Sequence, residues 1–111
     1  MEHLPDNWIV HLCTRFAWEQ ALKEGEYRPH SLKTEGFIHC SRPDQIALVA
    51  NRFFKDEPEL VLLWIDIKGL ESEIRWETAD GQEFPHLYGA LNLSAVKAAN
   101  SYSMTEELKW P

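Results

Sequence analysis

The sequence predicts an α+β fold, and three observations support this prediction. Short apolar segments rich in β-branched residues occur together with stretches of helical periodicity, and the two kinds neither alternate strictly nor segregate along the chain. A hydrophobic content of 44%, including five tryptophans, supplies the material for a core. The 111 residues leave room for one domain, so we expect a single domain over residues 1–111.

The charge balance excludes several functional classes. Asp and Glu number 18 against 11 Lys and Arg, which gives a net charge of −7. This balance opposes non-specific binding to nucleic acid or anionic lipid, so we expect neither partner. No apolar run approaches the ~20 residues that span a bilayer, and no signal-peptide pattern opens the sequence. We therefore expect a cytoplasmic protein without a membrane partner. Its oligomeric state is not indicated.

The first two elements have clear local signals. Ile9 to Thr14 is apolar apart from His11 and is rich in β-branched residues, which predicts a buried strand. Thr14 can then cap a helix from Arg15 to about Glu24. Gly25 stands where a helix C-terminus commonly places glycine.

The next region predicts an irregular stretch, a short strand and a helix. Pro29 argues against a long regular element over Glu26 to Gly36, and Phe37 to Cys40 follows as a short strand. Ser41 and Asp44 have the spacing of a capping box. The helix that they open carries an apolar stripe of helical period. Its members are Ile46, Val49, Ala50, Phe53 and Phe54.

Two further strands are predicted in the middle of the chain. Leu60 to Asp66 is apolar throughout and reads as a central strand, after which Lys68-Gly69 turns the chain. Ile74 to Glu77 alternates apolar and charged residues, as a half-exposed strand does. Asp80-Gly81 is a strong hairpin signal that returns the chain through Gln82 to Phe84.

The C-terminal region is less regular in pattern. After Pro85, we expect His86 to Gly89 to form a loop. A short strand and a helical turn near Ser94 to Lys97 follow, and a last strand is expected through Met104.

Three histidines are the first candidates for chemistry. His11 and His39 lie in predicted buried strands, where histidine is uncommon, and His86 lies in a predicted loop. If the two strands are neighbours, both imidazoles can open into one cleft. The alternative is that each histidine is a core residue satisfied by a backbone carbonyl.

Metal and thiol chemistry are weaker hypotheses. Three histidines could leave one metal position open for water, but no pair has a local ligand spacing, so we expect no metal. A nucleophile at Cys13 or Cys40 is weaker still, since His39 and Cys40 are adjacent and point to opposite faces of a strand. A disulfide between the two cysteines remains open.

Three carboxylates are candidate acid–base groups, namely Asp66, Glu77 and Glu83. The simpler interpretation is that each is solvated at a strand edge. Arg75 and Glu77 lie on the same face of their strand and are expected to pair with each other.

Several motifs together resemble a known family. They are Gly-Phe-Ile-His-Cys-Ser at 36–41, Pro-His-Leu-Tyr-Gly at 85–89 and the apolar strand at 60–66. This combination resembles the mostly bacterial domain-of-unknown-function family numbered nine hundred and fifty-two, over Ile9 to about Val96. The resemblance implies an ADP-ribosyltransferase-like fold, with two small curved, mostly antiparallel sheets around an NAD-binding cleft and two main helices.

The resemblance also implies roles for individual residues. His11 would anchor the adenosine ribose, and His39 would lie beside the nicotinamide, with Ser41 opening a helix next to the ligand. The His-x-Ser form is closer to the RNA 2′-phosphotransferase branch than to the toxins. His86 stands where the wider group usually has an acid, and Tyr88 would help to close the pocket.

The leading hypothesis is therefore a domain that binds NAD or a related small nucleotide-like ligand. His39 and His86 are the expected catalytic residues, and His11, Ser41 and Tyr88 are the expected ligand-binding residues. Glu83 is the acid nearest to the third position. The alternatives are a non-catalytic ligand-binding module of the same fold and a metal-dependent hydrolase built on three histidines.

Overall fold

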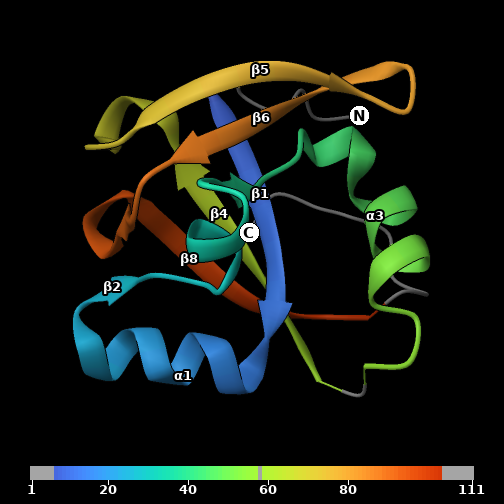
Figure 1. Ribbon diagram of the computed structural model, residues 1–111. Helices are drawn as coiled ribbons and strands as arrows, with labels where there is room; N and C mark the ends of the chain where they lie inside the picture. Colours follow the sequence, from blue (N-terminus) through green and yellow to red (C-terminus); the bar gives the residue numbers. More distant parts are fainter. Residues whose placement is uncertain (1–6, 58, 104–111) are drawn as a thin grey trace.

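The computed structural model describes residues 7–57 and 59–103, and its strands form antiparallel sheets (Figure 1). One sheet has the order β1-β4-β8, with β1 at Trp8–Thr14, β4 at Leu60–Asp66 and β8 at Val96–Tyr102. Another has the order β3-β6-β5, with β3 at Ile38–His39, β6 at Gln82–Tyr88 and β5 at Glu73–Ala79. The short strands β2 (Glu26–Tyr27) and β7 (Leu91–Asn92) pair with each other. The predicted α+β class with antiparallel sheets is confirmed.

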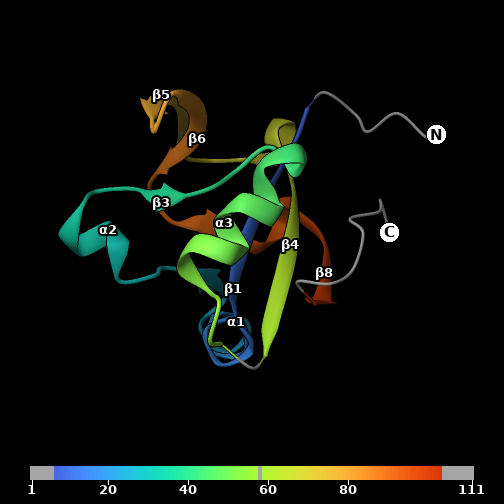
Figure 2. The same cartoon turned by 90° about the vertical axis from the view of Figure 1, so that its right-hand side faces the viewer.

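The helices are α1 (Arg15–Glu24), α2 (Ser31–Thr34) and α3 (Ile46–Phe53). Short 3₁₀ turns occupy Pro43–Gln45, Ile67–Gly69 and Leu93–Ala95. Figure 2 shows β3, β5 and β6 displaced to one side of β1 and β4, with α2 beside β3. The three-stranded sheets therefore do not stack as a flat sandwich.

The central strand explains where the core lies. β4 lies between β1 and β8, as its continuous apolar run predicts, and both of its faces are covered. On one face, Ile9 and Leu63 pack with residues of α1, β2, β3, β6 and β7. On the other face, Val10 and Trp64 pack against α3. Burial on both faces is why β1 and β4 lack the usual apolar–polar alternation.

Helix α1 begins and ends where its local signals predict. Thr14 Oγ1 accepts a hydrogen bond from the backbone N–H of Ala17 at 3.1 Å. Gly25 has a φ of 86°, and its N–H donates to the Ala21 carbonyl. Both ends are thus closed by interactions within the first and last turns. The segment after α1 is more regular than expected, because it contains β2 and α2.

The prediction that Ser41 caps the next helix is wrong. The Ser41 and Val10 backbones exchange two hydrogen bonds of 2.8 Å, so Ser41 connects the two three-stranded sheets. Pro43 opens a 3₁₀ turn instead, and Gln45 Oε1 accepts from the Arg42 N–H at 2.9 Å. Proline is favoured in the first turn of a helix, so the helical segment begins at Pro43 and not directly after Ser41. The apolar stripe is also narrower than expected, since Phe53 is 67% exposed.

The prediction that His86 lies in a loop is wrong as well. His86 belongs to β6, in which Pro85 is an interior residue. The carbonyl of Pro85 points toward β3 and accepts from the Cys40 N–H, so its missing N–H also faces that side. β3 ends at His39, next to this position. The missing N–H of the proline therefore faces away from β5 and does not interrupt the β5–β6 pairing.

The C-terminal elements follow the predicted order. β7 and a 3₁₀ turn lead into β8, which ends at Tyr102, and the predicted extension to Met104 lies outside the described residues. None of the helices within residues 7–57 and 59–103 combines the length and the apolar composition that a membrane span requires.

Candidate functional site

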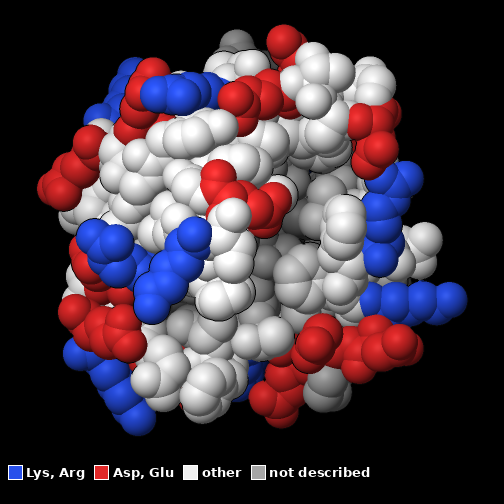
Figure 3. Space-filling view, viewed as in Figure 1, with Lys and Arg blue, Asp and Glu red and all other residues white. Residues whose placement is uncertain are grey.

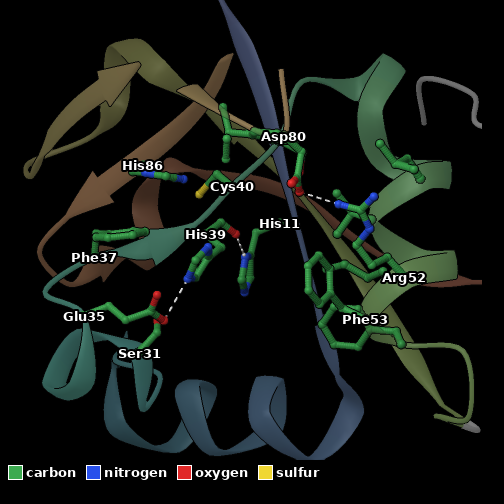
Figure 4. Close-up of a pocket in the computed structure, with 17 residues that line it drawn as sticks. His11, Ser31, Glu35, Phe37, His39, Cys40, Arg52, Phe53, Asp80 and His86 are labelled. Carbon is green, nitrogen blue, oxygen red and sulfur yellow. Dashed lines mark hydrogen bonds and ion pairs between the residues drawn. The ribbon is translucent and has the colours of Figure 1, made fainter. Parts of the chain in front are cut away.

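A cleft of ≈ 680 Å³ opens between α3 and the strands β1, β3 and β6. In Figure 4, Phe37 and His39 lie on one side of the cleft, and Arg52 and Phe53 of α3 lie on the other. Figure 3 shows the same face of the molecule, where uncharged side chains predominate around a hollow and most charged side chains lie at the periphery. The volume is within the range of about 300–1,000 Å³ typical of small-molecule sites.

His11 lies at the base of the cleft with both ring nitrogens engaged. Nδ1 donates to the His39 carbonyl at 2.6 Å, and Nε2 accepts from the Tyr27 hydroxyl at 2.8 Å. Burial lowers the pKa of His11 to about 4, and the hydrogen bond to the His39 carbonyl only partly opposes this shift. The imidazole is therefore neutral at pH 7, and it fixes the backbone position of His39. His11 thus matches the alternative interpretation, a core histidine bonded to a backbone carbonyl, and it also lines the cleft.

His39 lies at the solvent side of the cleft. Its Nε2 lies 2.9 Å from Glu35 Oε2, and its side chain is 53% exposed. Its ring is 4.8 Å from the Phe37 ring and 5.4 Å from the His86 ring, measured between centroids. Glu35 thus orients an accessible imidazole that a ligand in the cleft could contact.

His86 is more enclosed and more fully supported. Nδ1 donates to Glu77 Oε1 at 2.7 Å, and the Tyr88 hydroxyl donates to the same oxygen, also at 2.7 Å. The Phe37 ring stacks on the imidazole with a centroid distance of 4.1 Å. The hydrogen bonds from Tyr88 and His86 lower the pKa of Glu77. Glu77 is thus an anion that fixes His86 in one ring orientation.

The predicted pair between Arg75 and Glu77 does not form. Arg75 donates to Glu73 at 3.1 Å, and its guanidinium lies 4.2 Å from the centre of the Tyr88 ring. The Tyr88 hydroxyl bonded to Glu77 has a raised pKa, mainly because of that hydrogen bond. Arg75 therefore supports the site through Tyr88.

An ion pair lies on the α3 side of the cleft. Arg52 of α3 pairs with Asp80 at the tip of the β5–β6 hairpin (Figure 4). Both side chains are solvent-accessible, and the exposed ring of Phe53 lies next to Arg52 on the cleft wall. Exposed ion pairs contribute little stability, at most about 1 kcal/mol. A stronger anion could therefore replace Asp80 as the partner of Arg52.

The structure brings most of the predicted site residues into one cleft, which His11, His39, Ser41 and His86 all line. Tyr88 does not line the cleft, and its hydroxyl donates to Glu77, which in turn holds the cleft-lining His86. The functional role of each of these residues stays a prediction.

Sequence analysis missed Glu35, Phe37, Arg52 and Asp80 as site residues, and it gave Glu77 only as a candidate. The contact between Glu77 and His86 could have been predicted from the hairpin signal in the sequence. The Asp80-Gly81 turn places Glu77 opposite Phe84, one diagonal step from His86. Arg52 and Glu35 reach the cleft only through tertiary packing.

The metal and thiol hypotheses gain no support from the geometry. Among the described residues, no group of three or more His, Cys, Asp or Glu side chains is arranged to hold a metal ion. Cys13 and Cys40 are free and buried, and burial raises the pKa of each thiol to about 12. Neither thiol is poised as a nucleophile.

Comparisons with known proteins place the chain in a family. Residues 12–99 match the model of the family described as protein of unknown function, DUF952. The crystal structure of protein CC0527 from Caulobacter crescentus has 30% identity and a TM-score of 0.78, covering 85% of this chain and 84% of that one. Its solution structure has 30% identity and a TM-score of 0.72, covering 84% and 82%. No curated protein matches the chain.

Proposed function

The chain belongs to the DUF952 family of proteins of unknown function, and we propose that its cleft binds a nucleotide of the NAD or ADP-ribose class in an ADP-ribosyltransferase-like arrangement. The observation that carries the proposal is the composition of one cleft. Aromatic rings, an arginine and two carboxylate-held imidazoles line a volume suited to a ligand of this size.

The α3 side of the cleft suits the adenine and phosphate groups. Phe53 is 67% exposed at the cleft wall, and a base can stack on such a ring. Arg52 lies beside it, and a guanidinium binds phosphate oxygens in a bidentate manner. A diphosphate carries more charge than the Asp80 carboxylate, so it would displace Asp80 from Arg52.

The opposite side suits the second ribose. His86 donates through Nδ1 to Glu77, so its Nε2 can accept a hydrogen bond from a hydroxyl. His39 is held through Nε2 by Glu35 and offers Nδ1 in the same way. Phe37 lies against both imidazoles and adds an apolar wall.

His11 takes a different part in this proposal from the one that the family resemblance implies. A ribose hydroxyl could bond His11 only by replacing the Tyr27 hydroxyl or the His39 carbonyl. We therefore assign it a supporting role, in which it fixes the backbone of His39. Ser41 is buried at the cleft wall and remains available to a ligand through its hydroxyl.

Thermal unfolding with NAD, ADP-ribose and nicotinamide tests the proposal. A ligand at a hundredfold excess over its Kd adds about 2.7 kcal/mol to the free energy of unfolding, which raises Tm by roughly 10 °C. We expect this with NAD or ADP-ribose, a weakened response in His39→Ala, and a normal response in His30→Ala. His30 is an exposed histidine that does not line the cleft. No shift at millimolar nucleotide would contradict the proposal.

A further inference from the structure

We propose that His86 is a general base that activates water for hydrolysis of the N-glycosidic bond of an NAD-type nucleotide, and that Glu77 is its positioning residue. The inference rests on the proposed nucleotide cleft and adds an activity to it. It is carried by the arrangement of Glu77, Tyr88 and Phe37 around one imidazole.

Two direct contacts hold the ring of His86, and a third residue supports one of them. Glu77 accepts from Nδ1 at 2.7 Å, which places the proton on Nδ1 and the lone pair on Nε2. Tyr88 holds the same carboxylate oxygen at 2.7 Å, and Phe37 covers one face of the ring at 4.1 Å. A base whose second nitrogen is oriented by a carboxylate has the geometry of a catalytic imidazole.

Nε2 of His86 is accessible although the residue as a whole is 8% exposed. It has no hydrogen-bond partner among the described residues. Within the same residues, no buried side-chain nitrogen or oxygen lacks a partner. Nε2 must therefore be reachable from solvent, and His86 lines the cleft. A water molecule in the cleft can reach this nitrogen.

The other carboxylate–imidazole pair is less suited to this role. His39 and Glu35 have side chains 53% and 47% exposed, and water competes with their hydrogen bond. The side chain of His86 is only 10% exposed. A base in an enclosed position is held in one geometry before the substrate arrives, so we assign proton transfer to His86 and ligand contact to His39.

The step balances without any additional reactant. The oxygen of water forms a bond to ribose C1′ while the bond from C1′ to the nicotinamide nitrogen breaks. The electron pair of the broken bond goes to that ring nitrogen, which neutralises the pyridinium. One water proton goes to His86 Nε2 and from there to solvent. The products are ADP-ribose and nicotinamide.

The test compares Glu77→Gln with Glu19→Gln. Glu19 is an exposed acid on α1, and it does not line the cleft. We expect nicotinamide release by the wild-type protein and by Glu19→Gln. In Glu77→Gln we expect kcat to fall roughly 100-fold or more, the scale of general-base catalysis. Calorimetric Kd values for ADP-ribose should remain within about twofold, because Glu77 does not line the cleft.

Nitrogen NMR supplies a readout that does not depend on turnover. The His86 ring should carry its proton on Nδ1 in the wild-type protein and lose that preference in Glu77→Gln, while His39 is unchanged. Binding without nicotinamide release would overturn the inference and leave the nucleotide proposal intact. Wild-type kcat in Glu77→Gln would overturn it too. Absence of any nucleotide binding would overturn both proposals.

Discussion

Glu77 and His86 face each other diagonally across the β5–β6 hairpin and share a hydrogen bond of 2.7 Å. The register pairs Glu77 with Phe84 and Arg75 with His86. The two-residue turn at 80–81, with φ values of 52° and 78°, sets this register. A local turn signal therefore determines which carboxylate supports the imidazole in the cleft.

Glu77 should stabilise the fold in a pH-dependent way. Its pKa in the folded protein is lowered, so its stabilising effect is present above the unfolded pKa of about 4.3 and is lost as pH falls through the folded value. The difference in unfolding free energy between the wild-type protein and Glu77→Gln should be constant from pH 7 to about pH 5 and smaller near pH 3. Urea unfolding at these pH values measures it. An equal difference at every pH would refute the prediction.

His11 should make the protein sensitive to acid. Its folded pKa of about 4 lies below the unfolded value of about 6.5, so the unfolded state binds more protons as pH falls between these values. We expect this residue to cost on the order of 3 kcal/mol of stability between pH 7 and pH 4. His11→Gln should remove that part of the pH dependence, measured by urea unfolding. His30→Gln, at an exposed site, should retain it.

Arg52 should control the affinity for phosphate-containing ligands. Loss of a charge-assisted, bidentate contact costs about 1.5–3 kcal/mol, which is roughly a 10- to 100-fold rise in Kd for ADP-ribose in Arg52→Ala. Asp80→Asn should bind at least as tightly as the wild-type protein, because it removes the competing anion. Arg28→Ala, outside the cleft, is the matched control. Equal calorimetric Kd values in Arg52→Ala and Arg28→Ala would exclude the phosphate role.

A side chain at position 89 should destabilise the fold more than one at position 25. The φ of Gly89 is 148°, and a Cβ at this position would lie 2.4 Å from Ser72 Oγ. That hydroxyl donates to the Ala90 carbonyl at 2.8 Å, so it cannot move without losing the bond. Gly25 also has a positive φ, but its Cβ position is open. Gly89→Ala should cost at least about 2 kcal/mol, and Gly25→Ala about 1 kcal/mol. If thermal unfolding showed similar losses of stability in the two variants, the steric argument would be contradicted.

Sequence reasoning succeeded where the physical cause is local. The Thr14 cap and the glycine at 25 act within one helical turn, and the turn at 80–81 acts within four residues. The continuous apolar run of β4 likewise predicted burial on both faces of this strand, because that prediction does not require knowing which elements cover it.

The errors arise where a tertiary relationship overrides a local signal. Pro85 argued against a strand through His86, and only the end of β3 at His39 makes that proline acceptable. The alternation of side chains along one strand predicted that Arg75 pairs with Glu77. In the structure, Glu77 instead bonds His86 on the neighbouring strand. The position of α3 over the cleft, which brings in Arg52, depends on packing that a single sequence does not display.

The most direct test of the account is the amide NMR spectrum of the protein titrated with ADP-ribose. The account predicts saturable shifts grouped on cleft residues of two separate elements, namely Phe37 and His39 on one side and Arg52 and Phe53 on the other. Absence of shifts at millimolar ADP-ribose, or shifts confined to the outer face of α1, would contradict the claim that this cleft binds a nucleotide.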